Sequence, residues 1–219
     1  MMRLKSKNIK CLIFDFDGVI ADTDKGRFEA LSEVLSRRGI DLKSSCTIKD
    51  LLGISTGRFL RDKFPSFSSP VIRDIISERR HLFFNNLNKH CIVFPGAVDT
   101  VIDLHKAGFQ LTLATSNDTQ TINILIEYIG ISQFFNSVLG REQTENSSSG
   151  LKDYGLVLNI LNKNPVECIV IEDSPVGVTA AKDVGLFCIA FERYKSRILS
   201  EKADIIIHNY DELRRLFSI

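Results

Sequence analysis

Polar side chains follow directly on short apolar runs at three places in the chain. In chain order these are Asp15 and Asp17 after Cys11–Phe14, then Thr115, Ser116 and Asn117 after Leu111–Ala114, and finally Glu172 and Asp173 after Cys168–Ile171. Carboxylate oxygens without a histidine or cysteine cluster favour a hard cation, above all Mg²⁺. Because Mg²⁺ keeps several positions for water and for phosphate, these residue types indicate a metal site that can accept a phosphorylated ligand.

The spacing of Asp15 and Asp17 places both side chains on one side of the chain. Residues i and i+2 of a strand point to the same face, and Gly18 then allows a sharp turn. A single acid at the end of a strand is most often a turn former or a helix cap, and Asp173 would suit that role. Three such clusters favour a site instead, because ligands bind at the carboxyl ends of the strands in open α/β sheets.

The acidic residues need positive charge nearby. If their carboxylates share a small space, some must take up protons unless a cation compensates them. We therefore expect a metal site with Mg²⁺ as the cofactor. Its residues are Asp15, Asp17, Glu172 and Asp173.

Six apolar runs have the composition of strands that are buried on both faces. They are Cys11–Phe14, Leu111–Ala114, Ser137–Leu139, Cys168–Ile171, Phe187–Phe191 and Ala203–Ile207. Stretches with helical spacing lie between them, such as Ile122, Leu125, Ile126 and Ile129, which Gly130 ends. This alternation of strand and helix predicts an α/β fold with a doubly wound, mainly parallel, Rossmann-like sheet.

Residues 22–91 interrupt this alternation. They contain no clear strand run and predict helices over roughly 25–38, 57–63 and 70–88. We therefore expect an inserted α-helical cap domain of residues 22–91. The α/β core domain is then formed by residues 1–21 and 92–219.

Composition and charge exclude several classes of protein. The chain has 219 residues, 28 Lys and Arg against 27 Asp and Glu, and a formal net charge of +1, without the basic excess typical of nucleic-acid binding. No apolar run reaches the ~18 residues of a membrane span, and the run after the basic N-terminus is too short for a signal peptide. The five cysteines form no C-x-x-C pattern, which predicts buried, reduced thiols. We expect a cytoplasmic enzyme that binds neither nucleic acid nor membrane.

Four segments of the chain carry motif-like patterns. They are residues 15–23 (DFDGVIADT), residues 113–117 (LATSN), Lys152, and residues 171–178 (IEDSPVGV). In this order the segments resemble the four motifs of the haloacid dehalogenase-like (HAD) hydrolases, and the first and fourth together are highly specific. The resemblance covers nearly the whole predicted core and reaches the β-phosphoglucomutase-like and phosphatase branch, whose members carry a helical cap.

The resemblance implies roles for the acidic residues. Asp15 would be the nucleophile that attacks phosphorus and becomes an aspartyl-phosphate. Asp17 would be the general acid that protonates the leaving oxygen and then the base that activates water. Mg²⁺ would be held by Asp15, Asp173 and the backbone carbonyl of Asp17, while Glu172 would ligate the ion or orient a water.

Phosphate contacts are implied by the same resemblance. Thr115 would donate its hydroxyl to the phosphoryl group, helped by the neighbouring backbone amides at Ser116 and Asn117. Lys152 would act as a point charge on both the phosphoryl group and Asp15.

The lysine and the cap depart from the family's usual pattern. The family's lysine usually precedes Pro-x-Pro, whereas the chain reads KDYG from Lys152, and Lys163 is the alternative. Arg58 in the cap would reach a substrate hydroxyl or a second phosphate, or else lie solvated on a helix. Sugar phosphomutases of this branch carry a histidine where this chain has Arg27 and a lysine where it has Leu52, which argues against a mutase.

The function expected is a Mg²⁺-dependent phosphatase that hydrolyses a small phosphate monoester, such as a sugar phosphate, through an aspartyl-phosphate. A β-phosphoglucomutase-type sugar phosphomutase is the first alternative. A phospho-accepting, receiver-like signalling domain is an alternative of another class. The partner expected is a small phosphorylated metabolite, and the sequence leaves its identity and the oligomeric state open.

Overall fold

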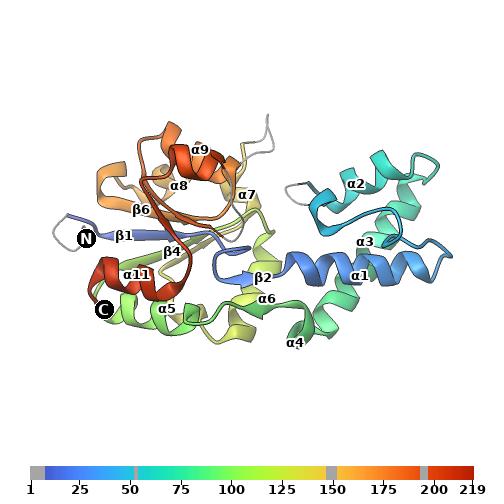
Figure 1. Ribbon diagram of the computed structural model, residues 1–219, viewed down its shortest axis with the longest axis horizontal. Coiled ribbons are helices and arrows are strands. Elements are labelled where there is room, and N and C mark those ends of the chain that lie inside the picture. The colour runs from blue at the N-terminus through green and yellow to red at the C-terminus, as the bar shows by residue number, and fades with distance from the viewer. Residues whose placement is uncertain (1–7, 52–53, 147–151, 193–196) are drawn as a thin grey trace. The chain divides into compact units, whose positions relative to one another are not determined.

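The computed structural model of the chain describes residues 8–51, 54–146, 152–192 and 197–219. The chain divides into two compact units, one of residues 1–21 and 93–219 and one of residues 22–92. The first unit contains the large sheet and is called the core unit. The second consists almost entirely of helices and is called the helical unit (Figure 1).

A six-stranded parallel sheet forms the centre of the core unit. Its strands, in spatial order, are β5 (Ser137–Leu139), β4 (Gln110–Ala114), β1 (Cys11–Phe14), β6 (Cys168–Glu172), β7 (Phe187–Phe191) and β8 (Ile205–Ile207). Each neighbouring pair of strands is parallel. Every residue of β1 and β6 is buried, which explains why the runs Cys11–Phe14 and Cys168–Ile171 are apolar without alternation. β1 has β4 on one side and β6 on the other, so the three strands that end in polar clusters are neighbours.

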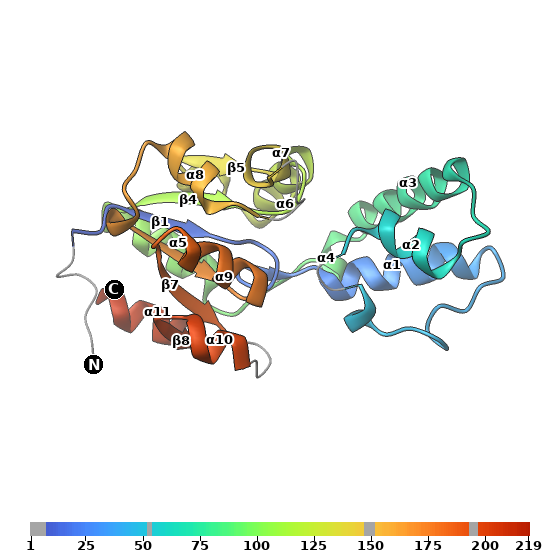
Figure 2. The same cartoon turned by 90° about the horizontal axis from the view of Figure 1, so that it is seen from above.

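Helices cover both faces of this sheet. They are α5 (Ala97–Lys106), α6 (Thr119–Ile129), α7 (Arg141–Thr144), α8 (Tyr154–Leu161), α9 (Pro175–Asp183), α10 (Arg197–Lys202) and α11 (Tyr210–Phe217), with short 3₁₀ helices at Ser132–Phe134 and Pro165–Glu167. In Figure 1, α8 and α9 lie on one face of the sheet, and α5 and α11 lie on the other; Figure 2 shows the same core from above. This arrangement confirms the predicted α/β fold with a doubly wound, mainly parallel sheet.

The helical unit is built around its own apolar core. Its elements are α1 (Asp24–Ser36), a 3₁₀ helix at Ile48–Asp50, α2 (Thr56–Lys63), α3 (Ser69–Asn85) and α4 (Leu87–His90). Residues from α1, α2 and α3, among them Leu31, Leu60 and Ile75, form one buried apolar cluster. At the borders of the unit, β2 (Ala21–Asp22) and β3 (Ile92–Val93) form a two-stranded sheet.

One predicted helix is shorter than the sequence pattern indicates. The pattern predicts a single helix over 70–88, but α3 ends at Asn85 and α4 begins at Leu87. Asn86 between them leaves the helical region with φ −133° and ψ 43°. Its side-chain amide donates to the Leu82 carbonyl at 3.2 Å, a local hydrogen bond of the kind that lets asparagine compete with helical geometry.

Two expectations from composition concern the thiols and the membrane. All five cysteines are free and buried, which agrees with the prediction of buried, reduced thiols. Among the helices of the described residues, none has both the length and the apolar character needed to cross a bilayer.

Candidate active site

Asp15 and Asp17 lie in the turn that follows β1. The backbone N–H of Asp15 donates to the Ile171 carbonyl at 3.0 Å, so pairing with β6 continues to this residue. Gly18 then adopts a positive φ of 79°, and its N–H donates to the Ala21 carbonyl at 2.9 Å. Since a positive φ suits glycine above all, Gly18 is what allows the chain to reverse at this point. Asp15 is 8% exposed, whereas Asp17 is half-buried.

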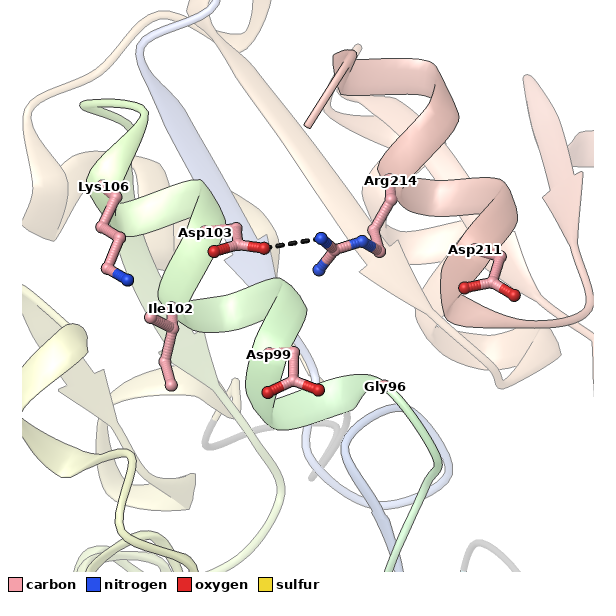
Figure 3. A pocket seen from close by; sticks show the side chains of 7 residues that line it. All are labelled: Gly96, Asp99, Ile102, Asp103, Lys106, Asp211 and Arg214. Atoms are coloured by element: carbon pink, nitrogen blue, oxygen red, sulfur yellow. Dashed lines mark ion pairs between the residues drawn. The ribbon is translucent and has the colours of Figure 1, made fainter.

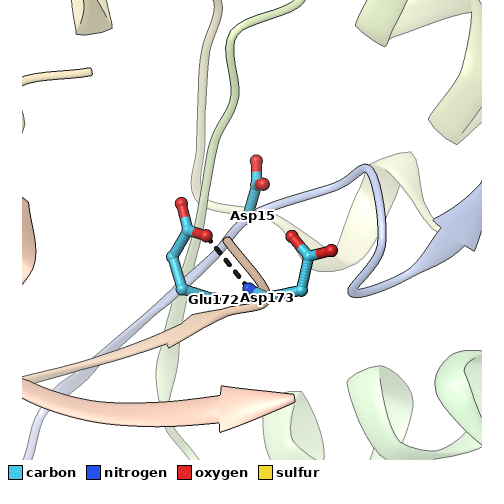
Figure 4. A group of neighbouring side chains, drawn as sticks. All are labelled: Asp15, Glu172 and Asp173. Atoms are coloured by element: carbon cyan, nitrogen blue, oxygen red, sulfur yellow. Dashed lines mark hydrogen bonds between the residues drawn. The ribbon is translucent and has the colours of Figure 1, made fainter. Parts of the chain in front are cut away.

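Glu172 and Asp173 stand at the end of β6, close to Asp15. One carboxylate oxygen from each of these three residues lies within 4.8 Å of the other two (Figure 4). Ser174 follows as the N-cap of α9, and its hydroxyl accepts from the Gly177 N–H at 3.0 Å. The parallel pairing of β1 with β6 therefore brings the acids of the first and fourth motifs to one edge of the sheet.

Both oxygens of the Glu172 carboxylate accept hydrogen bonds from the protein. Oε1 accepts from Lys152 Nζ at 2.8 Å and from the Tyr154 hydroxyl at 3.1 Å. Oε2 accepts from the Asp173 N–H, the Ser174 N–H and the Ser174 hydroxyl, each at 3.0 Å. A fully buried carboxylate requires this degree of satisfaction. Glu172 therefore ties Lys152 to the loop that follows β6.

Lys152 supplies positive charge to the acidic cluster. It lies just before α8, and its Nζ is 2.9 Å from Asp15 Oδ1 and 2.8 Å from Glu172 Oε1. Its side chain is only 6% exposed. Lys163, the alternative lysine, lies beyond the C-terminal end of α8, where its backbone N–H donates to the Leu158 carbonyl at 3.1 Å. Of these two lysines, Lys152 is the one that the structure brings to Asp15.

The charges of the cluster are unevenly balanced. Burial raises the pKa of Asp15 well above its ordinary value, and the carboxylates of Glu172, Asp173 and Asp17 add to this against the opposing effect of Lys152. Burial would lower the pKa of Lys152, but Asp15 and Glu172 outweigh burial and raise it. Burial also acts to raise the pKa of Glu172, but Lys152 and the hydrogen-bond donors hold it below its ordinary value. One ammonium thus serves two buried carboxylates, and Asp15 is the less compensated of them.

The donor set fits a hard divalent cation. The cluster consists of carboxylates alone, and if all three are ionised, the single ammonium of Lys152 leaves two negative charges without compensation. Such a set suits an ion like Mg²⁺, which prefers oxygen ligands. Asp15 and Asp173 are the carboxylates that would hold the ion, because protein donors already occupy both oxygens of Glu172.

Binding of Mg²⁺ is expected to tighten as the pH rises. Because the pKa of Asp15 is raised in the metal-free site, the ion must displace a proton from this carboxyl group. Each ion bound should release up to one proton, so the apparent affinity should increase by up to about tenfold per pH unit while Asp15 is protonated. Calorimetric titration in two buffers of different ionisation enthalpy measures both quantities. A pH-independent affinity without proton release would contradict the raised pKa of Asp15.

Thr115, Ser116 and Asn117 follow β4, on the other side of β1. Thr115 is buried, and its backbone carbonyl accepts from the Thr144 hydroxyl at 2.9 Å. Asn117 is also buried, and its Nδ2 donates to Asp17 Oδ2 at 2.7 Å. Ser116 is exposed. The strand order therefore joins the second motif to the first through the contact of Asn117 with Asp17.

Substitution of Gly177 is expected to disturb Glu172. A Cβ built on Gly177 would overlap the Glu172 carboxylate, so the first turn of α9 packs directly on this group. We expect Gly177→Ala to lower the free energy of unfolding by about 3 kcal/mol, because the buried carboxylate must move away from Lys152. Turnover should fall by roughly 100-fold, since the displaced groups define the site. Urea unfolding and turnover of an aryl phosphate measure the two effects.

Gly57→Ala is the matched control for this substitution. A methyl group at Gly57 in α2 would lie 3.4 Å from its nearest neighbour, Ile76 Cδ1, an ordinary contact. Alanine also favours the helix over glycine by about 1 kcal/mol, so this variant should lose neither stability nor turnover. A Gly177→Ala protein as stable and active as this control would show that the packing of α9 on Glu172 contributes to neither stability nor turnover.

Some residues of the site have no clear sequence signal, and one predicted residue lies elsewhere. The Tyr154 hydroxyl donates to Glu172, and the Thr144 hydroxyl donates to the Thr115 carbonyl. Neither residue belongs to a sequence motif, so neither could be predicted as part of the site. Arg58 belongs to α2 of the helical unit, where its side chain is 70% exposed and its Nε lies 3.6 Å from Asp62 Oδ2. The contact of Arg58 with a substrate stays a prediction.

A surface hollow elsewhere in the core unit has a different character. It has a volume of about 490 Å³ and lies between α5 and α11, with no residue shared with the acidic cluster (Figure 3). Asp99, Asp103 and Asp211 line it together with Lys106 and Arg214, and Arg214 Nη2 pairs with Asp103 Oδ2 at 2.6 Å. Because basic side chains accompany the acids of this hollow, it lacks the excess of carboxylates found at the ends of β1 and β6. The acidic cluster at β1 and β6 is therefore the candidate active site.

Comparison with known families places the chain in one of them. The family described as "Haloacid dehalogenase-like hydrolase" matches residues 12–191, a range that includes all four motif-like segments. The chain belongs to the haloacid dehalogenase-like hydrolases. This confirms the predicted family and the prediction of an enzyme of the hydrolase class.

Several relatives of similar length are named as phosphatases. The chain is 21% identical over 205 residues to validoxylamine A 7'-phosphate phosphatase of Streptomyces hygroscopicus subsp. limoneus, covering 94% of this chain and 96% of that protein. It is 24% identical over 189 residues to a phosphoglycolate phosphatase of Vibrio cholerae, covering 83% of each. These matches agree with the predicted phosphoglucomutase and phosphatase branch.

Solved structures share the fold over almost the whole chain. A predicted phosphoglycolate phosphatase from Haemophilus somnus superposes with a TM-score of 0.80 at 15% identity, covering 96% of this chain and 99% of that one. A β-phosphoglucomutase from Clostridium difficile gives a TM-score of 0.73 at 24% identity, covering 94% and 93%. At such identities the likeness concerns the fold, and it includes both a phosphatase and a mutase.

Proposed function

We propose that the chain is a Mg²⁺-dependent phosphatase that hydrolyses a small phosphate monoester through an aspartyl-phosphate on Asp15. The observation that carries this proposal is the contact of Asp15 Oδ1 with Lys152 Nζ at 2.9 Å, within a carboxylate cluster in which Asp15 and Glu172 are buried and Asp173 is half-buried. An ionised carboxylate needs no general base to act as a nucleophile. The phosphatases among the relatives, which act on phosphoglycolate and on validoxylamine A 7'-phosphate, support a small phosphorylated metabolite as the partner.

In the first half of the reaction, a carboxylate oxygen of Asp15 attacks phosphorus and the bond from phosphorus to the alcohol oxygen breaks. Asp17 gives its proton to the departing oxygen, so the product leaves as a neutral alcohol. The ammonium of Lys152 and the hydroxyl of Thr115 stabilise the phosphoryl oxygens. Mg²⁺, when bound, supplies the positive charge that allows an anionic nucleophile to approach an anionic ester.

In the second half, water attacks phosphorus and releases Asp15. Asp17, now ionised, takes the proton of this water, so the same residue serves as acid and then as base. Asp17 is half-buried in the turn after β1 and therefore remains accessible to water, whereas Asp15 is buried. This difference in exposure suits the two roles.

Glu172 receives a supporting role in this proposal. The metal ligands proposed are Asp15, Asp173 and the backbone carbonyl of Asp17. Glu172 instead orients Lys152 and the loop after β6, because both of its oxygens accept hydrogen bonds from the protein. Ligation of the ion or orientation of a water by Glu172 stays the alternative role for this residue.

Hydrolysis is favoured over sugar phosphomutation. Arg27, which stands where sugar phosphomutases carry a histidine, lies on α1 with its guanidinium carbon 6.0 Å from the centre of the Phe83 ring. Leu52 and Gly53, at the second point of departure, lie outside the described residues. A coupled assay with β-glucose 1-phosphate tests this choice, since a mutase would form glucose 6-phosphate whereas the proposed enzyme releases phosphate. A receiver-like signalling domain gains no support from the family match.

The substrate class is tested with a panel of phosphorylated metabolites. We expect Mg²⁺-dependent phosphate release from one or a few small monoesters, among sugar phosphates and phosphorylated small acids. Chelation should remove this activity and added Mg²⁺ should restore it. Undiminished turnover in the presence of a chelator, or hydrolysis of phosphodiesters alone, would contradict the proposed function.

A further inference from the structure

The side-chain amide of Asn117 is directed at two functional groups of the site. Its Nδ2 donates to Asp17 Oδ2 at 2.7 Å. The same Nδ2 also donates to Thr115 Oγ1 at 3.3 Å. The backbone N–H of Asn117 donates to that oxygen as well, at 3.2 Å. The amide nitrogen has two hydrogens, so it can serve Asp17 and Thr115 at once.

We infer that Asn117 is a positioning residue that holds Asp17 in place as the general acid. This inference rests on the proposed function. With an amide hydrogen on Oδ2, the proton that Asp17 donates is carried on Oδ1, so the acid has a defined orientation. Asp17 needs such support because it lies in a turn and is half-buried, whereas Asn117 is itself buried. When the proton moves from Oδ1 to the leaving oxygen, the carboxylate that remains keeps its donor from Asn117.

The same contacts set the direction of the Thr115 hydroxyl. Asn117 donates twice to Thr115 Oγ1, which uses both acceptor positions of that oxygen. The hydroxyl hydrogen is then the group that Thr115 presents to a phosphoryl oxygen. Asn117 therefore couples the phosphate-binding threonine after β4 to the acid after β1, although 100 residues separate Asn117 from Asp17.

The test compares two esters that differ mainly in their need for an acid. Phenyl phosphate releases a more basic oxygen than p-nitrophenyl phosphate, so its cleavage depends more on proton donation. The quantity to measure is kcat/KM for each ester with the full chain and Mg²⁺, because this constant covers the steps up to departure of the alcohol. In Asn117→Ala, the ratio of kcat/KM for phenyl phosphate to that for p-nitrophenyl phosphate should fall by about 10-fold or more.

Four further variants make the result decisive. Asn117→Asp keeps the shape but removes the donor and should lower the ratio as well, which covers the case that Asn117→Ala does not fold. Asp17→Asn should lower the ratio, and adding Asn117→Ala to it should lower the ratio no further, because the two residues act through one proton. Asn123→Ala, at an exposed position of α6, should leave the ratio unchanged.

Two outcomes would overturn the inference. If Asn117→Ala lowers kcat/KM equally for both esters, Asn117 holds the phosphoryl group instead of the acid. If it lowers neither, Asn117 has no part in the reaction. A wild-type chain that hydrolyses neither ester would contradict the proposed function itself, so the two failures are distinguishable.

Discussion

Turnover of an aryl phosphate should fall by at least about 1,000-fold when Asp15 is replaced by asparagine, because an amide cannot form the bond to phosphorus. The fold should tolerate this change. Burial and the neighbouring carboxylates raise the pKa of Asp15, so ionisation of Asp15 opposes folding as the pH rises. Asparagine removes this ionisation and keeps the shape of the side chain. In metal-free buffer at neutral pH, the free energy of unfolding should therefore not decrease.

The comparison for this variant is Asp183→Asn. Asp183 is an exposed residue at the end of α9, and its replacement should leave both turnover and stability near the wild-type values. Turnover and urea unfolding of the two variants are measured side by side. An Asp15→Asn enzyme that retains more than a few per cent of wild-type turnover would show that another group attacks phosphorus.

Replacement of Lys152 by methionine should impair both stability and turnover. Methionine fills much of the same space, but Asp15 and Glu172 lose the ammonium that lies 2.9 and 2.8 Å from their oxygens. Removing one partner of a buried ion pair typically costs about 3–5 kcal/mol, because the remaining charge is left buried without compensation. Turnover should fall by roughly 100-fold or more, since the phosphoryl group loses a fixed positive charge.

Lys163→Met is the control variant, which also replaces a lysine by methionine but at a position away from the acidic cluster. Lys163 lies beyond α8, and its replacement should change turnover by less than a few-fold. Added Mg²⁺ should recover part of the stability of Lys152→Met, because the ion compensates the same carboxylates. If Lys152→Met lowers turnover by less than a few-fold, or if Lys163→Met lowers it more than Lys152→Met does, Lys152 is not the lysine of the active site.

The strands and the acidic clusters could be predicted from the sequence because each has a local signal. Runs such as Cys11–Phe14 and Phe187–Phe191 are strands with the predicted limits, since burial on both faces demands an unbroken apolar sequence. Asp15, Glu172 and Asp173 come together because they end neighbouring parallel strands. The predicted association of these acids required no knowledge of their side-chain orientations.

The hydrogen bonds within the site could not be predicted in the same way. Asn117 reaches Asp17 because β4 lies beside β1, and the alternation of strands and helices does not state which strands are neighbours. The residue type of Glu172 suits a metal ligand, but its hydrogen-bond donors come from two segments of the chain, residues 152–154 and residues 173–174. Orientation and partners depend on the packed structure, whereas residue type and spacing are local properties.

The most direct test of the account is the reaction of an Asp17→Asn enzyme with p-nitrophenyl phosphate. This ester needs little help from an acid to release its alcohol, but hydrolysis of the phosphoryl-enzyme still needs the base that the variant lacks. We expect a rapid burst of about one p-nitrophenolate per enzyme, followed by slow turnover. Peptide mapping after an acid quench should locate the phosphoryl group on Asp15. Steady turnover without a burst, or a phosphoryl group on any other residue, would contradict capture of phosphorus by Asp15.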